Sequence, residues 1–136
     1  MQPKALCEKM GVGPQLEPEQ MTELAKAGYK AVINCRPDNE EPGQPTSQQL
    51  EEAARAAGLA YAHVPVVPGQ MGDEQVTRFN AALSELPQPV FGFCKSGMRA
   101  SSLWAVCRAS DLGADEVIER AGGAGYDLSA LKSRLG

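Results

Sequence analysis

Apolar and polar positions along the chain fall into blocks whose periods distinguish strands from helices. Short apolar runs with β-branched or aromatic residues predict buried strands at 30–35, 59–67 and 90–93. Between these runs, apolar side chains recur at the spacing of an amphipathic helix. The predicted helices cover 16–28, 46–58, 73–86, a stretch that begins near residue 98, and two short segments within 115–135 separated by Gly122-Gly123-Ala124-Gly125.

This alternation predicts an α/β domain with a central, mostly parallel sheet flanked by helices. We expect one domain over residues 1–136, with a loose N-terminal arm at about residues 1–11. In such a sheet, ligands bind beyond the carboxyl ends of the strands. The loops 36–43, 68–72 and 94–99 should therefore surround one cleft.

Composition narrows the class of protein. The chain is 43% hydrophobic with a net charge of −4, so it has no general attraction for nucleic acid or acidic membranes. No apolar run reaches the roughly 20 residues of a membrane helix, and no secretory signal is visible. These features predict a cytoplasmic protein that binds neither nucleic acid nor membrane. Four cysteines without a C-x-x-C pair, and one histidine, predict no metal site and no cofactor.

The candidate catalytic residues lie where the strand predicted at 90–93 is followed by a polar loop and then a helix. Backbone N–H groups converge on an anion in such a place. The loop begins with Cys94 and ends with Arg99. The helix N-terminus, Arg99 and Lys95 would all favour a thiolate at Cys94, which predicts a nucleophile with a guanidinium clamp for an anionic substrate. The competing interpretation is a buried structural cysteine. The residues predicted to bind the anion are Lys95, Ser96, Gly97, Met98 and Ala100.

Other polar residues near the predicted strand ends are weaker candidates. Arg36, Asp38 and Ser101 are candidate cleft residues. Asp73 is a candidate general acid, but it also suits the N-cap of the helix that follows it. The pair Glu40-Glu41 is interpreted as a solvated loop. The lone histidine, His63, precedes Pro65, a residue that favours an edge strand or an early strand end, and is interpreted as a structural histidine.

The segments GPQLEPEQ, AVINCRPDNE, HVPV and FCKSGMRASSLWA together resemble a family of bacterial domains named as the phosphatase-like part of beta-lactamase hydrolase-like proteins. The strand, cysteine loop, arginine and helix also resemble the signature of tyrosine and dual-specificity phosphatases. The resemblance covers roughly residues 12–110. It implies a dual-specificity-phosphatase-like fold, with Cys94 as the nucleophile and Arg99 as the anion clamp.

The sequence also departs from the main phosphatase pattern. Four residues separate Cys94 from Arg99, one fewer than in those phosphatases, and the position before the cysteine is Phe93 instead of histidine. Residues 63–70, where their aspartic acid is expected, contain no carboxylate. A missing general acid typically costs about 10²–10⁴-fold in rate. The shorter spacing resembles rhodanese-type sulfurtransferases, which carry sulfur as a cysteine persulfide.

Three functions follow from these observations. The first is hydrolysis of a phosphoester through a covalent Cys94 intermediate. The second is sulfur transfer through a Cys94 persulfide to a thiol acceptor. The third is binding of an anion without turnover. The expected partner is a small anionic substrate or a phosphoprotein, and for the second function also a thiol that accepts sulfur.

Overall fold

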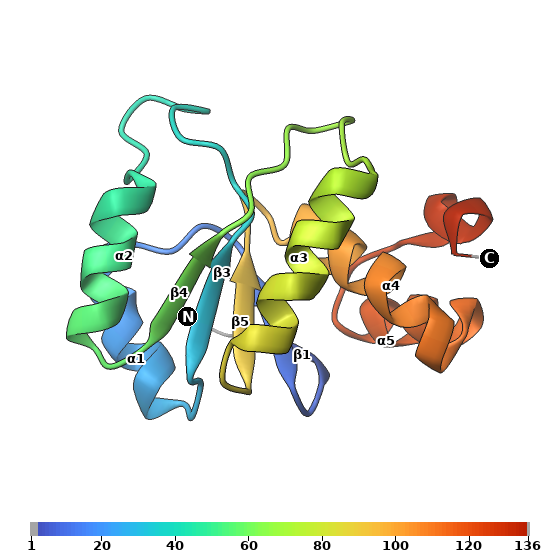
Figure 1. Ribbon diagram of the computed structural model, residues 1–136, viewed down its shortest axis with the longest axis horizontal. Helices are drawn as coiled ribbons and strands as arrows, with labels where there is room; N and C mark the ends of the chain where they lie inside the picture. Colours follow the sequence, from blue (N-terminus) through green and yellow to red (C-terminus); the bar gives the residue numbers. More distant parts are fainter. Residues whose placement is uncertain (1–2, 136) are drawn as a thin grey trace.

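The computed structural model describes residues 3–135 as one five-stranded sheet with helices on both faces (Figure 1). The strands lie in the order β1-β2-β5-β3-β4, and every neighbouring pair is parallel except β1 with β2. Their bounds are Lys4–Cys7 (β1), Met10–Gly13 (β2), Ala31–Asn34 (β3), Ala60–His63 (β4) and Val90–Phe93 (β5).

The helices are short, and most of them connect strands that lie parallel. Their bounds are Pro18–Gln20 (η1), Met21–Lys26 (α1), Ser47–Ala56 (α2), Asp73–Glu85 (α3), Met98–Leu112 (α4), Ala114–Gly123 (α5) and Ser129–Arg134 (η2). Among the residues described, no helix has the length and apolar character needed to cross a membrane.

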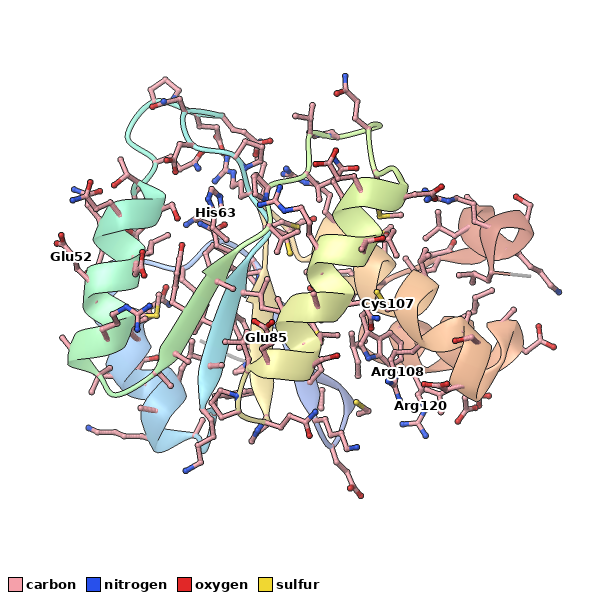
Figure 2. All side chains as sticks on the ribbon, viewed as in Figure 1. Glu52, His63, Glu85, Cys107, Arg108 and Arg120 are labelled. Carbon is pink, nitrogen blue, oxygen red and sulfur yellow. The ribbon has the colours of Figure 1, made fainter. Side chains whose placement is uncertain are left out.

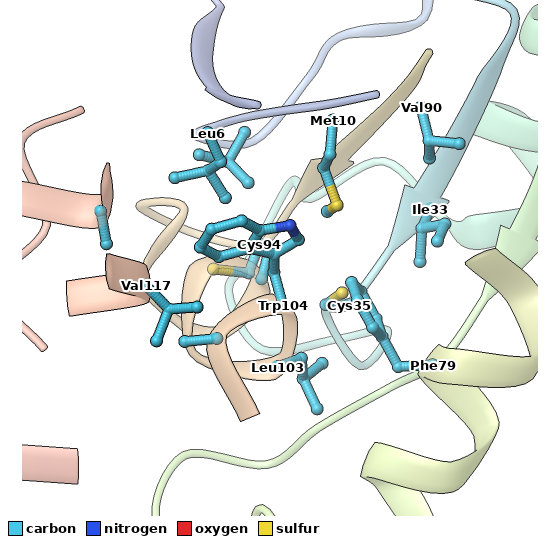
Figure 3. Close-up of a cluster of buried hydrophobic side chains, with 14 of the residues drawn as sticks. Leu6, Met10, Ile33, Cys35, Phe79, Val90, Cys94, Leu103, Trp104 and Val117 are labelled. Carbon is cyan, nitrogen blue, oxygen red and sulfur yellow. The ribbon is translucent and has the colours of Figure 1, made fainter. Parts of the chain in front are cut away.

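Side chains alternate across the strands and so divide the core into two layers. On one face, Val32 and Phe91 pack with apolar residues of α1 and α2. On the other face, Ile33 and Val90 belong to a larger cluster that includes Phe79 of α3 and residues of α4 and α5 (Figure 3). Both layers consist of closely packed buried side chains, so the sheet is a rigid support for the loops at its carboxyl edge.

The structure confirms the predicted fold class and several element boundaries. The sheet is mostly parallel, with β5 in its middle. β4 is an edge strand that ends at His63, two residues before Pro65, and an edge position tolerates the missing N–H of that proline. Thr46 caps α2, and Gln49 reciprocates as in a capping box.

The prediction of a loose N-terminal arm was wrong for the residues described. Residues 4–13 form the β1–β2 hairpin, and β2 pairs with β5 inside the sheet. The sequence did not indicate these two strands because Gly11 and Gly13 in β2 are poor strand formers in isolation. Packing requires them: a Cβ at Gly11 would lie 2.0 Å from the Tyr29 hydroxyl, and one at Gly13 would lie 2.8 Å from the Phe91 ring. Residues 1–2 of the predicted arm lie outside the described part.

The predicted N-cap of α3 was also wrong. Gly72 is the N-cap, and Asp73 is the first helical residue. The Gly72 N–H donates to the Gln75 side chain at 2.9 Å, which is one half of a capping box, and glycine has no side chain to accept from the N–H groups of the first turn. Asp73 then contributes its negative charge to the first turn of the helix, where the dipole favours it.

Candidate active site

The loop after β5 places Cys94 at the start of α4. Cys94 is buried, and its Sγ accepts the backbone N–H of Gly97 at 3.1 Å. Gly97 has φ +101°, a left-handed conformation that turns the chain into α4 at Met98. The Gly97 N–H therefore faces the Cys94 sulfur at the N-terminal end of α4, where the helix dipole is positive.

The loop is held by residues from two distant parts of the chain. The Tyr126 hydroxyl donates to the Ser96 carbonyl at 2.9 Å, and the Gln15 N–H donates to the Lys95 carbonyl at 3.2 Å. A Cβ at Gly97 would lie 2.2 Å from that hydroxyl and 3.0 Å from the Gly13 carbonyl oxygen. The loop is thus clamped on both sides. Sequence reasoning missed Tyr126 and Gln15 because neither belongs to a local motif.

Arg99 is bound at one end of its guanidinium by the carboxylate of Glu40. Nη1 donates to Glu40 Oε2 at 2.8 Å, and Nη2 donates to Oε1 at 3.0 Å. Nη1 also donates to the Val66 carbonyl at 2.8 Å. A guanidinium has five N–H donors. The two left without a partner in the described structure are Nε–H and one hydrogen of Nη2, which lie on the same edge and suit a bidentate oxyanion.

Arg36 extends this pair into a network. It is 2% exposed, and its Nε donates to Glu40 Oε1 at 2.7 Å. Its other nitrogens donate to Gln15 and Glu41. The hydrogen bond from Arg99 is the largest cause that holds the pKa of Glu40 below its usual range, and Arg36 adds to it.

The interpretation of Glu40-Glu41 as a solvated loop was therefore wrong for Glu40, whose side chain is only 18% exposed. Its partner Arg99 is distant in sequence, so no local pattern indicates the contact. The exposed Glu41 pairs with Arg36 and, at 3.6 Å, with Lys95, and the Arg36 hydrogen bond is the main reason that its pKa is lowered.

The remaining predicted residues of the loop divide into exposed and buried positions. Lys95 and Ser96 are exposed, and Met98 is 39% exposed. Ala100 is buried against the sheet. Ser101 is also buried, and its hydroxyl donates to the Gly97 carbonyl at 2.8 Å, so it supports the turn from behind.

Neither predicted carboxylate joins this cluster. The Asp38 carboxylate accepts the Ser47 N–H at 2.8 Å and so serves the start of α2. Asp73 lies exposed in the first turn of α3, and no hydrogen bond joins it to Cys94 or Arg99 in the described structure. His63 is bound through Nε2 to the Arg36 carbonyl at 2.9 Å, where it supports the loop after β3 (Figure 2).

A second thiol lies behind Cys94. Cys35 follows β3 as Cys94 follows the adjacent β5 (Figure 3). The Cys35 N–H donates to the Phe93 carbonyl at 2.8 Å. Burial raises the pKa of Cys35 well above its usual value, and the neighbouring Cys94 raises it further. Cys35 is therefore a neutral thiol of the core. Across residues 3–135, no group of three histidine, cysteine or carboxylate side chains is placed to hold a metal ion.

Solved structures resemble this arrangement of strands, loops and helices. A candidate phosphatase from Neisseria meningitidis has a TM-score of 0.86 at 33% identity and covers 97% of this chain and 94% of its own. The core catalytic domain of a PP-IP phosphatase from S. cerevisiae has a TM-score of 0.71 at 15% identity, covering 97% and 81%. Tyrosine-phosphatase structures match as well, so the fold is the phosphatase fold that the sequence predicted.

Sequence relatives place the chain in a family. The beta-lactamase hydrolase-like protein of Xylella fastidiosa is 36% identical over 123 residues, which cover 89% of this chain and 28% of that protein. The chain thus spans little more than a quarter of the length of that relative. Residues 3–111 match the family described as "Beta-lactamase hydrolase-like protein, phosphatase-like domain". The chain belongs to this family of phosphatase-like domains.

Proposed function

We propose that this protein hydrolyses small phosphomonoesters through a covalent intermediate on Cys94. The observation that carries the proposal is the placement of one sulfur and one guanidinium edge around the same turn. Cys94 Sγ accepts the Gly97 N–H of that turn, and Arg99 keeps its Nε–Nη2 edge free in the described structure while Glu40 binds Nη1 and Nη2. The phosphatase fold supports the same assignment.

In the first step, the Cys94 thiolate attacks phosphorus, an S–P bond forms, and the P–O bond to the ester group breaks. The electron pair leaves on the ester oxygen. The loop N–H groups and the free edge of Arg99 stabilise the equatorial oxygens while charge develops on them. In the second step, water attacks phosphorus, the S–P bond breaks, and phosphate and the thiolate are released.

Neither candidate acid is bound to Cys94 or Arg99 in the described structure. The Asp38 carboxylate is engaged at α2, and Asp73 lies in the first turn of α3. An ester whose oxygen leaves as a stable anion should therefore react much faster than an alkyl ester, because only the alkyl ester needs a proton in the transition state. We expect the kcat ratio of aryl to alkyl phosphates to be larger than in an enzyme with a general acid.

The proposal is tested by assaying the purified chain with p-nitrophenyl phosphate and, in parallel, with thiosulfate plus cyanide. The first should release p-nitrophenolate. Cys94→Ser should remove the activity, whereas the matched control Cys107→Ser, at a half-buried cysteine of α4, should retain it. Rapid quenching followed by mass spectrometry should reveal a phosphoryl adduct on Cys94.

Sulfur transfer is the competing outcome, since the short Cys94–Arg99 spacing suits it and a persulfide needs no acid for an alcohol. Thiocyanate formation with an inert phosphoester, together with a sulfur adduct on Cys94, would replace the phosphatase proposal. If neither substrate reacts while phosphate still binds, the loop is an anion-binding site without turnover.

A further inference from the structure

Two adjoining pockets lie beside the turn of the β1–β2 hairpin, at the end of the sheet opposite the Cys94 loop (Figure 1). Their volumes are about 120 Å³ and about 230 Å³, and both are lined by Cys7, Lys9 and Arg108. The N–H of Val90 at the start of β5 donates to the Lys9 carbonyl, whereas Cys94 follows the end of that strand. The four residues of β5 span about 13 Å, and Cys94 lines neither pocket. We refer to the two pockets together as the hairpin groove.

The larger pocket of the hairpin groove is lined by three cations, Lys9, Arg108 and Arg120. Figure 2 shows Arg108 and Arg120 next to each other. Arg108 binds Asp111 through Nη2 at 3.2 Å. Arg120 binds Glu116 through Nε at 3.0 Å. Both acids lie outside the groove lining, and each guanidinium keeps N–H donors without a protein partner in the described structure.

The groove lining carries more positive than negative charge, although the whole chain has a net charge of −4. In the described structure its one carboxylate belongs to the exposed Glu8, so its three cations leave a surplus of two positive charges. A phosphomonoester carries nearly two negative charges at neutral pH, and the guanidinium fork matches phosphate oxygens. A phosphate group therefore suits the larger pocket in both charge and hydrogen bonding.

The smaller pocket has a lining of a different kind. Its apolar members include the buried Met10 and Trp104. Its uncharged polar members are exposed and come from α3 and the segment before β5: Asn80, Ser84 and Gln88. Side-chain amides both donate and accept hydrogen bonds, and no carboxylate lines this pocket in the described structure. An apolar floor with a few polar groups is typical of a site for a small molecule. The smaller pocket therefore suits an uncharged body that forms hydrogen bonds.

Lys9 and Arg108 line both pockets, so a molecule held by these two side chains would reach both. We propose that the hairpin groove binds a small phosphomonoester, with its phosphate at the three cations and an uncharged, hydrogen-bonding body in the smaller pocket. A nucleoside and a sugar are both bodies of this kind. Binding there breaks no bond, so the inference does not depend on the chemistry at Cys94.

The experiment uses Cys7 as the reporter, because it is half-buried and lines both pockets. The Cys94→Ser chain, which consumes no phosphoester, is alkylated with N-ethylmaleimide, and mass spectrometry follows each cysteine. The probes are adenosine monophosphate, ribose phosphate, inorganic phosphate and adenosine. A phosphomonoester at about ten times its Kd should slow alkylation of Cys7 about tenfold. Alkylation of Cys107 should not change, because this half-buried cysteine lines neither pocket.

A matched pair of lysine variants tests the cations. Lys9→Gln should weaken the affinity for the phosphomonoester about threefold, a loss typical of one surface charge pair. Lys4→Gln replaces another exposed lysine of the same hairpin outside the lining, and it should keep the affinity. Arg120→Gln should also weaken binding. Since Arg120 donates to the Leu6 carbonyl at 3.4 Å, Lys9→Gln provides the test if that variant loosens the hairpin.

The four probes separate the possible results. Stronger protection by adenosine monophosphate than by ribose phosphate supports a nucleoside as the body, and equal protection by these two esters supports a sugar. Protection by adenosine equal to that by its phosphate would overturn the role of the cations. Protection by inorganic phosphate equal to that by the esters would overturn the role of the smaller pocket. If no probe protects Cys7, or if Lys4→Gln weakens binding as much as Lys9→Gln, the groove is not the proposed site. None of these results depends on phosphatase activity at Cys94.

Discussion

At the scale of single residues, Glu40 is the residue whose role the structure changes most. It lies between two arginines and binds Nη1 and Nη2 of Arg99, which leaves the Nε–Nη2 edge of that guanidinium free in the described structure. A carboxylate in that place fixes the direction of the guanidinium without competing for its free edge. We interpret Glu40 as a positioning residue for Arg99.

Replacing Glu40 with glutamine should lower kcat for an aryl phosphate by about tenfold, because Arg99 loses a bidentate charge-assisted contact. KM should stay equal or fall, since the site gains net positive charge and attracts the anion more strongly. Steady-state kinetics separate the two constants. Glu41→Gln is the matched control, because Glu41 contacts Arg36 and Lys95 but not Arg99. A parallel fall in both variants would contradict the positioning role.

Gly97 is the second residue with a sharp expectation. Alanine there combines a strained φ of +101° with a Cβ placed 2.2 Å from the Tyr126 hydroxyl. We expect Gly97→Ala to lose most activity and about 1–3 kcal/mol of stability in urea unfolding. Gly28→Ala has the same φ of +101° with nothing within 4 Å of its Cβ, so it measures backbone strain alone. Equal effects in the two variants would show that the clash at the loop is unimportant.

At the scale of elements, α5 and the segment after it support the loop from Cys94 to Arg99 as well as the core. The Tyr126 hydroxyl reaches the Ser96 carbonyl, and Val117 and Leu128 belong to the same apolar cluster as α4. The loop therefore depends on a segment that begins after the family match has ended.

Tyr126→Phe should lower the free energy of unfolding by about 1 kcal/mol, the net value of one hydrogen bond. We also expect a several-fold fall in kcat, because the Ser96 carbonyl is released and the turn loses part of its support. Thermal unfolding and kinetics measure the two effects. Tyr29→Phe is the control, since the Tyr29 hydroxyl has no hydrogen-bond partner in the described structure. Unchanged kinetics in Tyr126→Phe would mean that the turn keeps its conformation without the Tyr126 hydrogen bond.

Elements were predictable from the sequence where one local signal decided them. The capping box at Thr46 fixed the start of α2, and the apolar run at 90–93 fixed the central strand. The β1–β2 hairpin was missed because its glycines are required by tertiary packing against Tyr29 and Phe91, which no local pattern contains. The site followed the same rule. The loop from Cys94 to Arg99 is a contiguous motif, whereas Glu40 and Tyr126 reach it only through the fold.

At the scale of the whole molecule, the ion network ties stability to pH. The contacts with Arg99 and Arg36 lower the pKa of Glu40, and those with Arg36 and Lys95 lower the pKa of Glu41. A carboxylate with a depressed pKa stabilises the fold above its unfolded value, about 4.3 for glutamate, and loses that contribution as pH falls through the lower folded value. Acid unfolding should therefore begin below about pH 4.3.

Unfolding midpoints in urea, measured from pH 7 downward, test this dependence. The unmodified chain should lose stability steeply across the acid range, and Glu40→Gln should lose less, because it has no proton to take up at that site. The two curves should converge at the lowest pH. Parallel curves would show that Glu40 does not contribute to the acid sensitivity.

The contact between Tyr126 and the Ser96 carbonyl also links two equilibria. One is docking of the segment 124–131 on the loop, and the other is binding of an anion at the loop. If docking of this segment raises the affinity for the anion by some factor, thermodynamic reciprocity requires the bound anion to favour docking of the segment by the same factor. Saturating inorganic phosphate should therefore slow amide hydrogen exchange in residues 124–131, which lie far along the chain from the loop. The mobility of this segment would then depend on whether the loop holds an anion, so a partner that binds the segment could distinguish the two states.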